Sequence, residues 1–248
     1  MSDHIDIERH GAVQIIRMNR PDKKNALTRA MYAAMAAALS DGDADPDIRV
    51  HVFLGLPGAF TAGNDLADFL SYATGGEQGT EVYDFLLALA NSQKPMIAGV
   101  DGVAVGLGTT MQLHCDLTIA TPNALFRAPF IDLGLLPEAG STLLAPAAMG
   151  SQQAFALLAL GEDFDAERAL AAGLIHSVVD SDRLEPAVIA KAEAVAAKPP
   201  EALKIARDLM KGDRAPVVER LRAEGKLFRE RLKSKEALAA LTAFMTRK

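Results

Sequence analysis

The sequence predicts an α/β protein that ends in a helical region. Short apolar runs, typical of buried strands, alternate with segments of helical composition over residues 1–195, whereas residues 196–248 contain only helical segments. Half of the 248 residues are hydrophobic and 23% are charged, so the chain is long enough to bury a sizeable core. We therefore expect an α/β core over residues 1–195 and a helical region over residues 196–248.

The first half of the chain opens with strands. Residues 5–8 alternate apolar and polar side chains, and residues 13–18 form a second run, which together predict a hairpin. Thr28 is suited to cap a helix over residues 29–39, and residues 41–43 (DGD) together with Asp45-Pro46 are expected to end it. Further strands are predicted over residues 48–54, 96–100 and 117–120, and a helix over residues 81–90.

The second half predicts mostly helices. Asp165 is suited to cap a short helix that Gly173 ends, and residues 174–179 form the last predicted strand. The remaining helices are predicted over residues 185–197, 201–210, 217–232 and 235–245. Their apolar side chains exceed what four short helices hide among themselves, so we expect these helices to pack on the core or on another subunit.

Composition excludes several classes of function. A net charge of −6 and a pI near 5.4 argue against nucleic-acid binding, because phosphate binding needs a basic face. The single cysteine, Cys115, forbids an intrachain disulfide, and the five scattered histidines show no metal-ligand spacing. No signal peptide or membrane span is recognisable. We expect a cytoplasmic protein with metal-free chemistry and neither nucleic acid nor membrane as a partner.

Three glycine-containing turns stand out, at residues 62–66 (AGNDL), 102–108 (GVAVGLG) and 133–142 (LGLLPEAGST). The first two turns each follow an apolar strand and precede a helix, where the backbone N–H groups of the first helical turn are free to bind a ligand. Two such donors form an oxyanion hole, and each contributes roughly 3 kcal/mol to stabilising a developing anion. For the second turn, close packing of helix on strand explains the glycines equally well. Its spacing does not match the dinucleotide-binding pattern GxGxxG.

The third turn holds one carboxylate, Glu138, among apolar and glycine residues. A single glutamate on a turn is most often solvated. If the three turns converge on one pocket, however, Glu138 is desolvated, which raises its pKa and makes it a stronger base once ionised. Ser141 in the same turn lacks the G-x-S-x-G elbow and a histidine assignable as its base, which argues against a serine hydrolase.

Together these motifs resemble the crotonase superfamily of enoyl-CoA hydratases and isomerases. The resemblance covers nearly the whole chain, from NRPDKKNAL at residues 19–27 through the AGNDL turn and residues 94–116 to residues 133–142, in the family's order. It implies a crotonase-like spiral of ββα repeats, a helical C-terminal trimerisation region, and a homotrimer or dimer of trimers. It also implies an acyl-CoA substrate, with CoA as part of that substrate and no separate cofactor.

The resemblance also implies roles for individual residues. The backbone N–H groups of Asn64 and Leu107 would hold the thioester oxygen. Similar hydratases use two glutamates to position and split water, but Thr110 and Phe130 stand in those two places here. Glu138 stands where similar Δ3,Δ2-enoyl-CoA isomerases carry their single catalytic glutamate. The resemblance therefore predicts an enoyl-CoA delta-isomerase in which Glu138 is both base and proton shuttle.

Substrate-binding residues are expected around the same turns. Lys24 is a candidate for contact with the CoA phosphates, although a solvated charged turn is an equal alternative for that lysine. The turn around Ala26 resembles the family's adenine pocket, and Phe130 is expected at the acyl pocket. The full expected set is Lys24, Ala26, Ala62, Gly63, Asp65, Leu66 and Phe130.

Two other functions stay open at the level of sequence. The first is an enoyl-CoA hydratase, or another CoA-thioester enzyme of the same fold, with relocated acid groups, for which Asp65, Asp132 or Glu162 would have to supply the missing acid. The second belongs to another class, a non-catalytic acyl-CoA-binding protein. Proton exchange at C2 of a bound acyl-CoA separates either enzyme from the binding protein.

Overall fold

The computed structural model describes residues 2–65, 67 and 79–246. Its strands form a six-stranded sheet of order β1-β2-β3-β5-β7-β10 and a four-stranded sheet of order β4-β6-β8-β9. The larger sheet contains β1 (Ile5–His10), β2 (Val13–Met18), β3 (Val50–Leu54), β5 (Met96–Val100), β7 (Leu117–Ala120) and β10 (Ser177–Val178). The smaller sheet contains β4 (Ala59–Thr61), β6 (Val103–Val105), β8 (Leu125–Arg127) and β9 (Phe164–Asp165).

A strand of the larger sheet is repeatedly followed by a short strand of the smaller one. β3 leads to β4, β5 to β6 and β7 to β8, and helices follow these pairs. β4, β6 and β8 pair in parallel, as do β3, β5 and β7, whereas β1 and β2 form the predicted antiparallel hairpin. The predicted spiral of ββα repeats is therefore confirmed.

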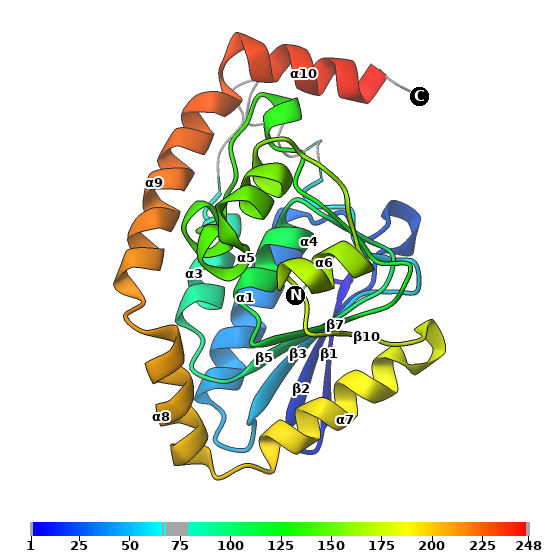
Figure 1. The fold of residues 1–248 in the computed structure, drawn as a ribbon, viewed down its shortest axis with the longest axis vertical. Helices are drawn as coiled ribbons and strands as arrows, with labels where there is room; N and C mark the ends of the chain where they lie inside the picture. Colours follow the sequence, from blue (N-terminus) through cyan, green and yellow to red (C-terminus); the bar gives the residue numbers. More distant parts are fainter. Residues whose placement is uncertain (1, 66, 68–78, 247–248) are drawn as a thin grey trace.

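Helices cover both faces of the larger sheet (Figure 1). The helices are α1 (Arg29–Ala44), α3 (Glu81–Asn91), α4 (Leu107–Thr110), α5 (Ser141–Leu158), α6 (Ala166–Ala172), α7 (Leu184–Ala196), α8 (Pro200–Lys211), α9 (Ala215–Leu232) and α10 (Lys235–Thr246). The side chains of β2 divide between two hydrophobic clusters, because neighbouring residues of a strand point to opposite faces of the sheet. Val13 and Ile15 pack with Val188 of α7, whereas Ile16 and Met18 belong to the larger cluster that contains Met31 of α1.

One predicted helix, α1, is longer than expected, and one helix, α5, was not predicted. α1 runs beyond the predicted Leu39 to Ala44 and ends at the Asp45-Pro46 signal, with Asp45 as its C-cap, whereas Gly42 lies inside the helix and serves close packing. A Cβ at Gly42 would lie 2.3 Å from Oε1 of Gln14 and 2.6 Å from Cε1 of His51. α5 begins at Ser141, within the 133–142 turn that carries Glu138, and bends at Gly150, whose φ is 76°.

Other predicted elements keep their place but change in length. Asp165 caps α6 as expected, because its side chain accepts a hydrogen bond from the N–H of Arg168, and Gly173 ends the helix in the left-handed conformation. The last strand is shorter than predicted and covers only Ser177–Val178. The helix expected after Gly106 has four residues before it tightens into a 3-10 turn.

The C-terminal helices share the main hydrophobic core. Leu221 and Leu232 of α9 and Leu241 of α10 are almost fully buried in the same cluster as the α1 and α3 side chains. α9 runs along one side of the molecule against α3 and α5 (Figure 1). The boundary predicted at residue 195 coincides with the end of α7, and a division into two domains stays a prediction. None of the helices in the described ranges combines the length and apolar character that crossing a bilayer requires.

Candidate active site

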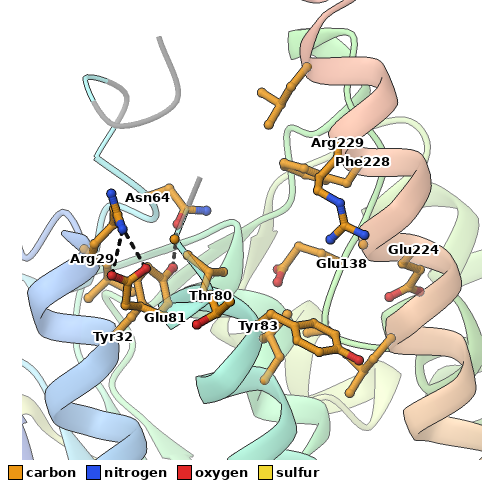
Figure 2. A pocket seen from close by; sticks show the side chains of 18 of the residues that line it. Arg29, Tyr32, Asn64, Thr80, Glu81, Tyr83, Glu138, Glu224, Phe228 and Arg229 are labelled. Carbon is orange, nitrogen blue, oxygen red and sulfur yellow. Dashed lines mark hydrogen bonds and ion pairs between the residues drawn. The ribbon is translucent and has the colours of Figure 1, made fainter. Parts of the chain in front are cut away.

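A cavity of about 280 Å³ lies between α1, α3, α9 and the Glu138 turn (Figure 2). Its walls are largely apolar, with side chains such as Leu27, Val82, Leu86 and Leu221. Asn64 and Glu138, from two of the three turns singled out in the sequence, line the same cavity. Of the three turns expected to converge, these two therefore meet at the cavity, whereas no residue of the 102–108 turn is among the described residues that line it.

Glu138 is a buried acid of this cavity. The residue is only 7% exposed, and its Oε1 accepts a hydrogen bond of 2.7 Å from the hydroxyl of Thr110. Oε2 is buried and has no hydrogen-bond partner among the described residues. Leaving a buried polar atom unpaired costs about 1 to 3 kcal/mol, so an unpaired carboxylate oxygen in a cavity marks a place where a ligand atom belongs.

The environment makes Glu138 a weak acid. Burial in the cavity raises the pKa of its carboxyl from 4.5 to about 8, the Thr110 hydrogen bond opposes this rise, and the negative charge of Glu224 adds to it. Glu138 therefore titrates close to physiological pH, where one group can both accept and return a proton.

The backbone next to Glu138 is strained at Ala139 and is fixed by a hydrogen bond from His114. Ala139, fully buried, adopts a φ of 63°, a left-handed conformation that costs a residue with a Cβ roughly 1 kcal/mol or more. His114 donates a 2.7 Å hydrogen bond from Nε2 to the carbonyl of Ala139. Burial lowers the pKa of His114 to about 4, so its ring is neutral at pH 7 and its Nε2 proton is committed to this carbonyl.

The two expected oxyanion donors follow two adjacent parallel strands. β4 and β6 pair through Ala59 with Val103 and Thr61 with Ala104, and both donors follow the carboxyl ends of these strands. A Cβ on Gly63 would lie 2.9 Å from the carbonyl oxygen of Val105 and 3.9 Å from the nitrogen of Gly106, which shows how closely the two turns approach.

Both donor groups are free for a ligand. Within the described part of the chain, neither the N–H of Asn64 nor that of Leu107 donates to a protein acceptor. Gly106 precedes Leu107 with φ 58° and ψ −116°, a conformation that favours glycine. The side chain of Asn64 is also fixed, because the hydroxyl of Tyr32 donates a 2.6 Å hydrogen bond to its Oδ1.

The expected substrate-binding residues divide into two groups. Ala62, Gly63 and Asp65 belong to the turn beside the cavity, and Asp65 accepts a 2.8 Å hydrogen bond from Nη1 of Arg20. Leu66 lies outside the described residues. Lys24 is exposed, and its carbonyl accepts a 2.8 Å hydrogen bond from the N–H of Ala62.

Ala26 and Phe130 complete the expected set. The carbonyl of Ala26 accepts a 2.8 Å hydrogen bond from Nη1 of Arg20, so the predicted adenine turn is joined to the Asp65 turn through one guanidinium. Phe130 is 5% exposed and lies against Gly106, beside the Leu107 donor rather than among the described residues that line the cavity.

Sequence reasoning missed a second buried carboxylate. Glu224 of α9 is 3% exposed and lines the cavity together with Glu138. A signal for it exists in the helical spacing of α9, since Glu224 interrupts a stripe formed by Val217, Leu221 and Phe228 that all face the core. An acid inside an apolar stripe is expected to be buried and paired.

The fold and this site define a crotonase-type protein, a ββα spiral that places a buried carboxylate and two free backbone donors near one apolar cavity. A family model described as "Enoyl-CoA hydratase/isomerase" matches residues 8–248, and the chain belongs to this family.

Curated relatives include both activities in that description. "Enoyl-CoA delta isomerase 2" of Rattus norvegicus is 32% identical over 253 residues, which cover 100% of this chain but 64% of the rat protein. The chain thus spans a little under two thirds of that relative's length. "Probable enoyl-CoA hydratase EchA14" of Mycobacterium tuberculosis is 36% identical, and the match covers 86% of this chain and 82% of the mycobacterial protein.

Solved structures agree over the full length. The structure of Pseudomonas aeruginosa OdaA is 41% identical with a TM-score of 0.93 and covers 99% of this chain and 100% of its own. A putative enoyl-CoA hydratase/carnithine racemase from Magnetospirillum magneticum AMB-1 is 43% identical with a TM-score of 0.82 and covers 100% and 98%. The chain is therefore an enzyme of the enoyl-CoA hydratase/isomerase family.

Proposed function

We propose that this enzyme is a Δ3,Δ2-enoyl-CoA isomerase that moves the double bond of a 3-enoyl-CoA to the 2-trans position. The observation that carries the proposal is Oε2 of Glu138, a buried and unpaired oxygen at the cavity that holds Asn64. It supplies one proton carrier, which is what a 1,3-proton shift requires.

In the proposed reaction, the ionised Glu138 takes the proton from C2 of the substrate. The C2 electron pair moves toward the thioester carbonyl and gives a dienolate, whose oxygen is stabilised by the N–H groups of Asn64 and Leu107. The same carboxylic acid then returns the proton to C4, and the double bond forms between C2 and C3. Atoms balance without any other reactant, so no separate cofactor is needed beyond the CoA of the substrate.

The second candidate, hydration, requires a second acid that can handle water. Of the alternatives considered from sequence, Asp65 is ion-paired with Arg20, and Glu162 is ion-paired with Arg168. Asp132 is exposed and lies near Arg127. Glu224 reaches the cavity, but its two oxygens accept hydrogen bonds from the backbone and side chain of the Glu138 turn and helix α5. These pairings favour isomerisation over hydration.

One pair of assays separates the candidates. The isomerase converts an unconjugated 3-enoyl-CoA to the conjugated 2-trans product, so absorbance of the conjugated enoyl thioester appears. A hydratase instead removes that absorbance from crotonyl-CoA. Loss of crotonyl-CoA absorbance without turnover of 3-enoyl-CoA contradicts the proposal, and absence of both activities with retained acyl-CoA binding supports the non-catalytic alternative.

We further propose a homotrimer or dimer of trimers in the cytoplasm. The support for assembly is the exposed apolar surface of α8, where Leu209 and Met210 are each 79% exposed. Light scattering coupled to size exclusion measures the assembly directly, and a monomeric mass contradicts it.

A further inference from the structure

Helix α9 delivers a buried carboxylate to the turn that carries Glu138. Glu224 lies one helical turn beyond Leu221 and faces the same cavity as Glu138 (Figure 2). No hydration or isomerisation step above uses it, yet a buried carboxylate is destabilising unless it is paired. Its position therefore needs a reason.

The contacts of Glu224 are all with residues that directly follow Glu138. Oε2 accepts a 2.6 Å hydrogen bond from the N–H of Gly140, and Oε1 accepts bonds of 3.1 Å and 2.6 Å from the N–H and hydroxyl of Thr142. Gly140 is the N-cap residue of α5 and has no side chain to satisfy the first N–H groups of the helix. Glu224 performs this capping from a distant helix.

These contacts favour the ionised form of Glu224. All three groups that it contacts donate, and an ionised carboxylate is an acceptor only. The helix N-terminus adds a favourable positive end. Arg220 donates a 3.0 Å hydrogen bond to the same Thr142 hydroxyl and brings a positive charge that opposes the rise in the pKa of Glu224 caused by burial.

We propose that Glu224 is a positioning residue for Glu138, which fixes the turn through Gly140 and Thr142 and holds a negative charge beside the proton carrier. The inference rests on the proposed role of Glu138 in proton transfer. Abstraction of a weakly acidic C2 proton is favoured by a stronger base, so a neighbouring negative charge serves the reaction as well as the fold.

Other charged and titratable groups line the same cavity as Glu138. Among the described residues, the charged ones are Arg29, Asp65, Glu81, Glu224 and Arg229, and the neutral titratable ones are Tyr32 and Tyr83. Arg29 is hydrogen-bonded to Glu81, and Asp65 to Arg20, so their charges are largely balanced. Glu138 accepts one hydrogen bond and Glu224 accepts three, so negative charge settles on Glu224 first and opposes ionisation of Glu138.

The experiment compares the wild-type enzyme with Glu224→Gln, Glu224→Asp and a matched control, Glu219→Gln, at an exposed position of the same helix. The titration of Glu138 is followed by 13C NMR of glutamate carboxyl groups, with its signal assigned by its absence in Glu138→Gln. Steady-state kinetics with a 3-enoyl-CoA are recorded across the same pH range. The NMR readout does not depend on which reaction is catalysed.

Glu224→Gln is expected to lower the pKa of Glu138 by about one pH unit or more. Its kcat falls roughly tenfold or more because the turn is less well fixed, while KM stays within about twofold. Glu224→Asp keeps the charge but withdraws it by one methylene, so kcat falls while the pKa of Glu138 stays near that of the wild type. Glu219→Gln behaves as the wild type.

A Glu138 pKa and a kcat that both match the wild type in Glu224→Gln overturn the inference. If that variant does not fold, Glu224→Asp decides, since a wild-type kcat in it overturns the positioning role. Failure of the proposed function is seen separately, because it leaves the wild-type enzyme itself without isomerase turnover.

Discussion

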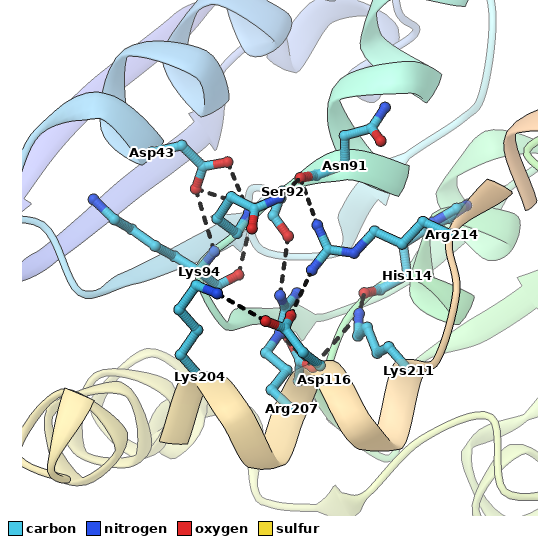
Figure 3. A network of polar contacts seen from close by, with 12 residues as sticks. Asp43, Asn91, Ser92, Lys94, His114, Asp116, Lys204, Arg207, Lys211 and Arg214 are labelled. Atoms are coloured by element: carbon cyan, nitrogen blue, oxygen red, sulfur yellow. Dashed lines mark hydrogen bonds and ion pairs between the residues drawn. The ribbon is translucent and has the colours of Figure 1, made fainter. Parts of the chain in front are cut away.

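Two buried polar clusters in this molecule are built in opposite ways. In the first, which we call the α8 network, the guanidinium of Arg207 is 3.0 Å from both carboxylate oxygens of Asp116 and 2.9 Å from the carbonyl of Ser92 (Figure 3). Lys211 adds a 2.7 Å hydrogen bond to the carbonyl of His114. The second cluster is the Glu138 turn, where Oε2 of Glu138 is unpaired and Ala139 is strained.

The difference separates structure from function. Polar groups that serve only the fold are expected to be paired, as in the α8 network. An unpaired buried acid and a strained backbone are both unfavourable, and they persist only where the surrounding structure holds them in place. Such arrangements are characteristic of active sites. His114 joins the two clusters, since its carbonyl accepts from Lys211 and its ring donates to the carbonyl of Ala139. His114 is therefore a structural link between the paired and the unpaired cluster.

The largest expected effect concerns the stability cost of Glu138. Its pKa rises from 4.5 to about 8 on folding, so the destabilisation caused by Glu138 is absent below pH 4.5 and grows as pH increases toward 8, to about 5 kcal/mol. Glu138→Gln does not ionise and loses none of this. Urea unfolding at pH 5 and pH 9 measures the difference, with Glu219→Gln as control. A gap between wild type and Glu138→Gln that is equal at both pH values contradicts the prediction.

The α8 network is expected to respond to substitution in stability alone. Arg207→Met leaves Asp116 with the N–H of Met96 and the ammonium of Lys211 as partners, and it lowers the free energy of unfolding by about 2 to 4 kcal/mol. Lys204→Met on the same helix breaks an exposed pair with Asp208 and changes it by less than about 0.5 kcal/mol. Turnover per folded molecule stays near wild type for both, and a selective loss of kcat in Arg207→Met at full folding would assign the network a catalytic part.

Thr110→Val tests the one hydrogen bond that the carboxylate of Glu138 accepts among the described residues. The Thr110 hydroxyl stabilises the ionised form of Glu138, so its removal raises the pKa of Glu138 further. The rise of kcat/KM with pH is then expected to shift to higher pH by about half a unit to one unit. This direction is opposite to that expected for Glu224→Gln, and a shift of both variants in the same direction is incompatible with our assignment of the two contacts.

The smallest effect is expected at Tyr32, whose hydroxyl bonds to Oδ1 of Asn64. Tyr32→Phe keeps the buried ring and removes one hydrogen bond, which costs about 1 kcal/mol of stability. Because the Asn64 turn is then held less firmly, kcat is expected to fall roughly three- to tenfold. Thermal unfolding and steady-state kinetics check both values, and an unchanged kcat argues that the backbone alone positions the Asn64 donor.

The sequence predicted the features that depend on local pattern. Strands such as residues 96–100 are buried on both faces and appear as continuous apolar runs, and Thr28 and Asp165 are local capping signals that act as expected. Glu138 was recognisable because a carboxylate is rare in an apolar turn.

Features that depend on distant parts of the chain were not predicted. Gly140 and Glu224 are 84 residues apart, so their hydrogen bond has no local signature. Thr110 was interpreted only as a missing acid, although its hydroxyl bonds to Glu138. Gly42 was interpreted as a helix end because its real reason, the side chains of Gln14 and His51 above it, lies on neighbouring strands.

The central claim is that Glu138 transfers the proton at C2. Its most direct test is exchange of the C2 hydrogens of a 3-enoyl-CoA in deuterated water, followed by mass spectrometry for the wild type and Glu138→Gln. We expect deuterium incorporation with the wild type and a loss of at least about 10³-fold in Glu138→Gln, with acyl-CoA affinity roughly unchanged. Exchange at the wild-type rate in Glu138→Gln would show that another group carries the proton and would contradict the claim.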